Sequence, residues 1–115
     1  MHSLKLKSYA KINIGLKILS KRNDGFRNIS TLFQEINFYD TLEIGKTGGE
    51  VLFDSNKTWL KNDNTNLCIK AFNKLKNRFD IGGIKINLKK RIPTFAGLGG
   101  GSSNAATILK GVNHL

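Results

Sequence analysis

The sequence predicts a single α+β domain in which a mixed sheet packs on helices. Segments with an apolar residue at every second position, as in half-buried strands, gather in the first half of the 115 residues. Two segments with apolar residues at helical spacing follow, one past the middle of the chain and one at its C-terminal end. No internal repeat, low-complexity tract or linker divides the chain, and this length suits one domain with a modest core.

We predict four or five strands in the first half. The clearest covers residues 11–18, where apolar and polar residues alternate, and the sequence KRNDGF at 21–26 then indicates a turn. Residues 29–38 and 41–47 are rich in β-branched and aromatic residues and predict two separate strands. Residues 50–54 predict another.

Two helices and one more strand complete the prediction. The polar run NDNTN at 62–66 precedes an amphipathic helix over 67–79, which a glycine pair ends. The apolar face of this helix holds Cys68, Ala71, Phe72, Leu75 and Phe79. Residues 84–90 alternate again and predict a strand. The last helix carries Ala105, Ile108, Leu109, Val112 and Leu115 at helical spacing.

The composition restricts the possible partners and location. The net charge of +11, from 19 Lys and Arg against 8 Asp and Glu, favours polyanions, either nucleic acid or phosphorylated small molecules. No apolar run approaches the roughly 20 residues of a membrane-spanning helix, and the N-terminus lacks the pattern of a signal or transit peptide. We therefore expect a cytoplasmic protein. The single cysteine, Cys68, is predicted to be a buried and unreactive thiol.

A glycine loop, GLGGG at residues 97–101, lies between the last predicted strand and the last helix. Ser102, Ser103 and Asn104 follow it, and these residue types cap helix N-termini. A helix N-terminus attracts anions, and glycine allows the backbone to approach a phosphate closely. The stretch has neither the lysine of a Walker loop nor the third glycine of a dinucleotide fingerprint. We expect a phosphate loop of another kind, with a structural turn as the alternative.

The stretch PTFAGLGGGSSNAA resembles the phosphate loop of the GHMP kinases, which include galactokinase, homoserine, mevalonate and phosphomevalonate kinases. Further family motifs occur in the same order: AKINIGL at 10–16, DGFR at 24–27, TLFQ at 31–34, DTL at 40–42, NLCIKA at 66–71 and KRIP at 90–93. The resemblance covers nearly the whole chain. It implies that residues 1–115 form the N-terminal ATP-binding domain of a GHMP kinase, a fold similar to the second domain of ribosomal protein S5.

Within the family, the chain most resembles the branch that phosphorylates the 2-hydroxyl of 4-diphosphocytidyl-2-C-methyl-D-erythritol, in non-mevalonate isoprenoid precursor synthesis. The resemblance implies a small-molecule kinase with ATP and Mg²⁺ as cofactors, and no association with a membrane. A basic RNA-binding or nucleotide-binding module without kinase activity is the alternative, which the net charge allows.

The same resemblance implies the roles of individual residues. Lys11 is the active-site lysine, near the attacking hydroxyl and the transferred phosphoryl group. Asn13, Phe26 and Arg27 contact the substrate. Phe26 and Arg27 stand where the family usually has Tyr and His, and Arg lacks the acceptor that imidazole offers to the cytosine amino group. ATP is contacted by Asn66, Leu67, Lys90, Pro93, Thr94, Phe95, Ala96, Gly97, Leu98, Gly99, Gly100, Gly101, Ser102 and Ser103.

Simpler structural roles remain open for three of these residues. Asn66 suits a helix cap, Leu67 a core position and Lys90 a surface charge. In the family, the aspartate that acts as the base lies downstream of the glycine loop, and this sequence stops before it, at Leu115. We therefore expect a portion truncated at its C-terminal end, without the C-terminal GHMP domain and inactive alone.

Overall fold

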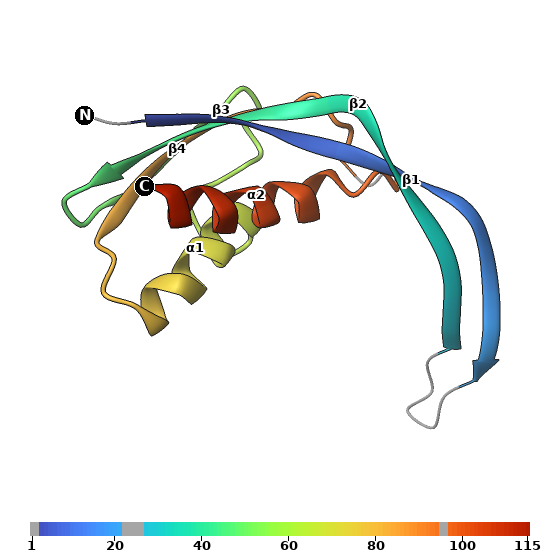
Figure 1. Cartoon of the computed structure of the whole chain (residues 1–115). Coiled ribbons are helices and arrows are strands. Elements are labelled where there is room, and N and C mark those ends of the chain that lie inside the picture. Colours follow the sequence, from blue (N-terminus) through green and yellow to red (C-terminus); the bar gives the residue numbers. More distant parts are fainter. Residues whose placement is uncertain (1–2, 22–26, 95–96) are drawn as a thin grey trace.

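The computed structural model describes residues 3–21, 27–94 and 97–115, and their side chains except those of 13–21 and 27–33. The elements, in chain order, are β1 (Ser3–Lys21), β2 (Arg27–Thr47), β3 (Val51–Ser55), α1 (Leu67–Arg78), β4 (Gly83–Lys89) and α2 (Gly100–His114). Both helices lie on the same face of the sheet (Figure 1). The predicted α+β class is confirmed.

The sheet has the strand order β1-β2-β4-β3. β1 and β4 each pair antiparallel with β2, whereas β3 and β4 are parallel. Parallel neighbours need a crossover connection, and α1 supplies it between β3 and β4. The prediction of a mixed sheet is therefore confirmed.

The prediction of two separate strands over 29–38 and 41–47 is wrong. They form one strand, β2, because Tyr39 and Asp40 stay paired with Tyr9 and Ser8 of β1. The described residues of the first half thus form three strands rather than four or five. Register shifts interrupt the β1–β2 ladder at three places, and such irregularities bend and twist a strand pair. The pair continues past the helices as a curved arm (Figure 1).

The core lies between the sheet and the two helices. The predicted alternation of β4 is confirmed, since Ile84, Ile86 and Leu88 are buried and the residues between them are exposed. These three pack with apolar residues of β2 and of both helices. The buried cluster comprises Leu42, Ile44, Cys68, Ile69, Ala71, Phe72, Ile84, Ile86, Leu88 and Ile108.

The helices differ from the prediction at their ends. α1 ends at Arg78, so Phe79 lies beyond it and is 58% exposed, outside the predicted apolar face. α2 begins at Gly100, and Ser102 and Ser103 therefore lie within its first turn instead of capping it. Leu109, predicted on the apolar face of α2, is exposed. None of the helices in the described ranges is long and apolar enough to span a membrane.

Candidate functional site

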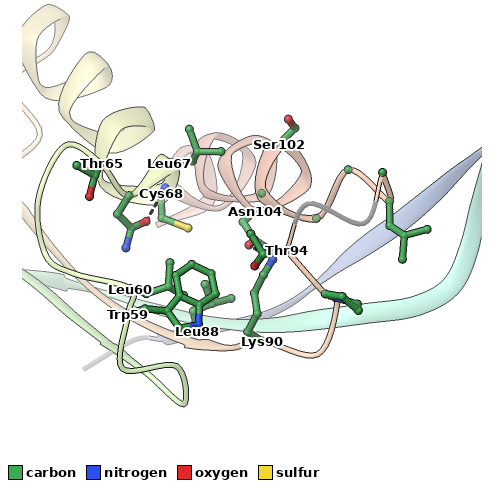
Figure 2. Close-up of a pocket in the computed structure, with 17 residues that line it drawn as sticks. Trp59, Leu60, Thr65, Leu67, Cys68, Leu88, Lys90, Thr94, Ser102 and Asn104 are labelled. Atoms are coloured by element: carbon green, nitrogen blue, oxygen red, sulfur yellow. Dashed lines mark hydrogen bonds between the residues drawn. The ribbon is translucent and has the colours of Figure 1, made fainter.

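A pocket of about 460 Å³ lies between the loop before α1, the end of β4 and the start of α2 (Figure 2). Most of the residues expected to contact ATP line it, although they come from separate parts of the chain. These are Asn66, Leu67, Lys90, Pro93, Thr94, Gly97, Leu98, Gly99, Gly100, Gly101 and Ser102. Ser103 does not line the pocket, and Phe95 and Ala96 lie outside the described residues.

The start of α2 forms one end of this pocket. Its N-cap is Gly99, in the left-handed conformation with φ of 68°, and no side chain caps the helix. The first intrahelical bond runs from the N–H of Ser103 to the carbonyl of Gly99 at 2.9 Å. The N–H groups of the residues before Ser103 therefore have no partner within the helix. With no acidic residue in the first turn, this end of the pocket favours an anion.

Lys11 of β1 contacts the glycine loop directly. Its backbone N–H donates a hydrogen bond of 2.9 Å to the carbonyl of Leu98. The space that a Cβ of Gly99 would occupy is taken by the Lys11 side chain, whose Cε would lie only 2.6 Å away. The fold thus places the predicted active-site lysine against the predicted phosphate loop.

Lys90 is buried rather than a surface charge, being 6% exposed. Its Nζ lies 2.7 Å from Oδ2 of Asp40 and donates a hydrogen bond of 2.9 Å to Oδ1 of Asn104. Asp40 is fully buried and also accepts bonds from the N–H groups of Arg91 and Ile92, at 2.6 and 2.8 Å. Lys90 therefore lines the pocket with a charge that is already neutralised.

The environment of Asp40 acts on its pKa in two directions. Burial raises the pKa, but the bonds from the N–H of Ile92, the ammonium of Lys90, the N–H of Arg91 and the amide of Asn104 outweigh it. The pKa consequently lies below its ordinary value. Asp40 is an anion at neutral pH, matched to the cation of Lys90.

The ion pair between Asp40 and Lys90 belongs to a larger polar network beside the first turns of α2. Asn104 of α2 donates to Oδ2 of Asp40 at 3.0 Å and to Oγ of Ser8 at 2.8 Å. Ser8 in turn donates to Oγ of Ser103 at 2.9 Å. Among the described residues, no buried side-chain nitrogen or oxygen lacks a partner. The network joins β1 and β2 to the first turns of α2. The only signals for it in the sequence are isolated polar residues, such as Asp40, within otherwise apolar patterns.

The start of α1 forms another wall of the pocket. Oδ1 of Asn66 accepts from the N–H of Cys68 at 3.0 Å, and its Nδ2 donates to the carbonyl of Lys61 at 3.0 Å. Asn66 is thus a helix cap that also lines the pocket. Leu67 is 45% exposed, so it is no core residue. Cys68 is 1% exposed, which confirms the expected buried thiol, and burial raises the pKa of this thiol to about 12.

The pocket also has an apolar end that none of the sequence motifs indicated. Trp59, Leu60 and Leu88 line it opposite the start of α2 (Figure 2). Trp59 is 53% exposed although it lines a cavity. The only signal in the sequence was a lone tryptophan within a polar loop.

The side chains of the three predicted substrate contacts lie outside the described part of the structure. Phe26 lies outside the described residues. Asn13 and Arg27 lie on β1 and β2, opposite Phe33 and Lys21 in the ladder, but their side chains lie outside the described part. These contacts remain predictions.

Known proteins resemble the chain along its whole length. The family model of the GHMP kinases N terminal domain matches residues 66–115. The 4-diphosphocytidyl-2-C-methyl-D-erythritol kinase of Pelodictyon phaeoclathratiforme is 47% identical over 116 aligned residues, covering 100% of this chain and 40% of that kinase. The chain therefore spans about 40% of the length of this curated relative.

Solved structures show the same relationship. A crystal structure of 4-(cytidine 5'-diphospho)-2C-methyl-D-erythritol kinase superposes with a TM-score of 0.84 at 33% identity, covering 96% of this chain and 40% of that one. A homoserine kinase from Cytophaga hutchinsonii shares the fold, with a TM-score of 0.71 at 20% identity over 97% of this chain and 35% of its own.

Proposed function

We propose that the chain is part of a GHMP kinase and that its pocket binds ATP with the triphosphate on the glycine loop, because the N-terminal domain model of that family matches residues 66–115 and the fold resembles that of a kinase structure. As part of a small-molecule kinase, the domain serves to transfer the γ-phosphoryl group of ATP to the 2-hydroxyl of 4-diphosphocytidyl-2-C-methyl-D-erythritol. Relatives of this name, at up to 47% identity over the whole chain, support this substrate. We place the reaction in the cytoplasm, as part of isoprenoid precursor synthesis.

One observation carries the proposal: the uncapped N-terminus of α2 opens on the pocket with Lys11 alongside it. The free N–H groups of the first turn and the helix dipole bind phosphate oxygens. Gly99 has no side chain that would block them or displace Lys11. A nucleoside triphosphate carries the negative charge that a helix N-terminus and a lysine stabilise.

Phosphoryl transfer requires positioning of the reactants and neutralisation of charge more than covalent chemistry by the protein. The helix N-terminus holds the phosphates, and the ammonium of Lys11 stabilises the negative charge of the group in transfer. The base that receives the hydroxyl proton is not Asp40, because this carboxylate is fully buried and paired with Lys90.

Mg²⁺ accompanies the nucleotide in this proposal. The described residues hold no group of three or more His, Cys, Asp or Glu side chains placed to bind a metal. Ser102 is exposed and lines the pocket, and its hydroxyl is an oxygen ligand of the type that Mg²⁺ takes. Bound Mg²⁺ would neutralise phosphate charge.

Calorimetric titration of the purified chain with ATP and Mg²⁺ tests the proposal. We expect saturable binding that Gly99→Val abolishes, because valine introduces strain at a positive φ and displaces Lys11. A parallel titration with a generic RNA separates the alternative. RNA binding without any effect of ATP would favour the basic binding module over the kinase.

A further inference from the structure

We propose that Trp59 is the platform on which the nucleobase of the bound nucleotide stacks, and that the pocket accepts guanine almost as well as adenine. This inference rests on the proposed function, because it assumes that the triphosphate lies on the glycine loop. It adds how the base is recognised and how selective the site is.

The two ends of the pocket have opposite chemistry. The first turn of α2 presents backbone N–H groups, and the other end presents the indole of Trp59 beside Leu60, with Leu67 on the α1 side (Figure 2). A nucleoside triphosphate has the same division into a charged chain and a planar base. When phosphates bind at α2, the base reaches the end at which Trp59 is 53% exposed.

The loop that carries Trp59 is fixed to the wall of the pocket. Nδ2 of Asn56 donates to the carbonyl of Lys90 at 3.0 Å, and the N–H of Lys90 donates to Oδ1 of Asn56 at 2.7 Å. Within the loop, the N–H of Leu60 donates to the carbonyl of Lys57 at 3.2 Å. The backbone that carries the indole is therefore anchored before a ligand arrives, which lowers the entropic cost of stacking.

Three polar side chains around this end, those of Asn66, Lys90 and Thr65, already make hydrogen bonds within the protein. Asn66 uses its oxygen for the N–H of Cys68 and its amide nitrogen for the carbonyl of Lys61. Lys90 uses its ammonium for Asp40 and Asn104. The hydroxyl of Thr65 donates to Asp63.

These hydrogen bonds affect how the protein recognises the base. Discrimination between adenine and guanine requires hydrogen bonds to the base edges, whereas stacking on an aromatic ring tolerates every base. With these three side chains held by bonds within the protein, we expect stacking and apolar contact to dominate. We therefore expect similar affinities for ATP and GTP.

The chain provides its own probe, because Trp59 is its only tryptophan. We would titrate the unsubstituted chain with ATP, GTP and inorganic tripolyphosphate, each with Mg²⁺, and record tryptophan fluorescence. ATP and GTP should both change the emission, with dissociation constants within about fivefold of each other. Tripolyphosphate should bind calorimetrically with little change in emission.

Substitutions measured by calorimetry separate the two ends of the pocket. Trp59→Ala should weaken ATP binding about tenfold or more and leave tripolyphosphate affinity within about twofold. Trp59→Phe keeps an aromatic face and should bind ATP within about threefold of the unsubstituted chain. Phe79→Ala is the matched control, since Phe79 is a similarly exposed aromatic residue that does not line this pocket, and it should leave ATP affinity unchanged.

The outcomes distinguish the inference from the function on which it rests. ATP binding that Trp59→Ala leaves unchanged overturns the stacking role alone. ATP binding more than about fivefold tighter than GTP binding overturns the lack of selectivity between the two bases. If neither ATP nor tripolyphosphate binds the unsubstituted chain, the proposed function is overturned and the inference with it.

Discussion

Lys11 and Gly99 occupy adjoining space. A Cβ on Gly99 would lie 2.6 Å from Cε of Lys11 and 3.2 Å from its Cγ. The two residues belong to β1 and to the N-cap of α2, and the 2.9 Å bond between the N–H of Lys11 and the carbonyl of Leu98 holds the two segments together. This contact sets the position of the lysine relative to the phosphate loop.

Gly99→Ala should destabilise the chain by about 2–5 kcal/mol. The backbone has φ of 68° at this position, which costs a residue with a Cβ about 1–2 kcal/mol. The clash between the new Cβ and Lys11 should destabilise the fold further, as overpacking of a core does, by about 1–3 kcal/mol. Urea denaturation followed by circular dichroism measures the loss.

Gly97→Ala is the control for this substitution. Gly97 has a similar φ of 75°, but a Cβ there would meet nothing within 4 Å. We expect a loss of only about 1–2 kcal/mol, from the backbone alone. Equal losses for the two variants would contradict the contact between Gly99 and Lys11.

Lys11→Met should reduce phosphoryl transfer much more than ATP binding. We would test it in a chimera that joins residues 1–115 to the remainder of the Pelodictyon phaeoclathratiforme kinase. Loss of a cation at the transferred group should lower kcat by about a thousandfold or more, while the ATP dissociation constant changes less than about tenfold. Lys85→Met is the control, since Lys85 is exposed on β4, whereas the Lys11 side chain contacts the glycine loop at Gly99. The reverse pattern, weaker ATP binding with unchanged kcat, would remove the assigned role of Lys11.

Asp40→Asn should destabilise the chain by about 3–5 kcal/mol at neutral pH. The substitution leaves the buried ammonium of Lys90 without its counter-charge, and breaking one partner of a buried ion pair has a cost of this size. Chemical denaturation checks the value. Asp54→Asn, at an exposed position on β3, should change the stability by less than about 0.5 kcal/mol.

The stabilising effect of the Asp40 charge should be lost in acid. Its folded-state pKa lies below the ordinary value of 3.8, so the ionised carboxylate stabilises the fold at any pH above that value. The contribution falls as the pH drops below 3.8 toward the folded-state pKa. The stability difference between the unsubstituted chain and Asp40→Asn should therefore shrink between pH 5 and about pH 3. A constant difference over this range would exclude the carboxylate as its source.

Cys68 should react with thiol reagents only when the chain unfolds. Burial raises its pKa to about 12, and the thiolate is the reactive form. At about pH 8, labelling with a disulfide reagent should be far slower than that of free glutathione, whose thiol has an ordinary pKa. At a urea concentration that unfolds the chain, the labelling rate of Cys68 should rise to that of glutathione. Rapid labelling of the folded chain would show that the thiol is accessible.

The sequence by itself determined the elements whose apolar residues recur with a clear period. The alternation in 84–90 and the helical spacing in 67–79 correspond to β4 and α1, because these periods decide which side chains can reach a common core. The glycine loop was also located correctly between a strand and a helix. Its resemblance to the GHMP kinases pointed to most of the residues that line the pocket.

Local patterns could not show that β2 is continuous, because its middle is held in the strand by pairing with β1. Local patterns also could not show that Lys90 is buried. A lysine is buried at an acceptable cost only when a partner such as Asp40 neutralises its charge. That partner comes from another strand. Nor could they place Trp59 opposite the start of α2, because Asn56 holds its loop on the backbone of Lys90. Local sequence specifies which side chains share a face, whereas strand pairing and packing decide which distant residues meet. Only the tertiary structure therefore brings Trp59 to the pocket at the glycine loop and Lys11 against Gly99.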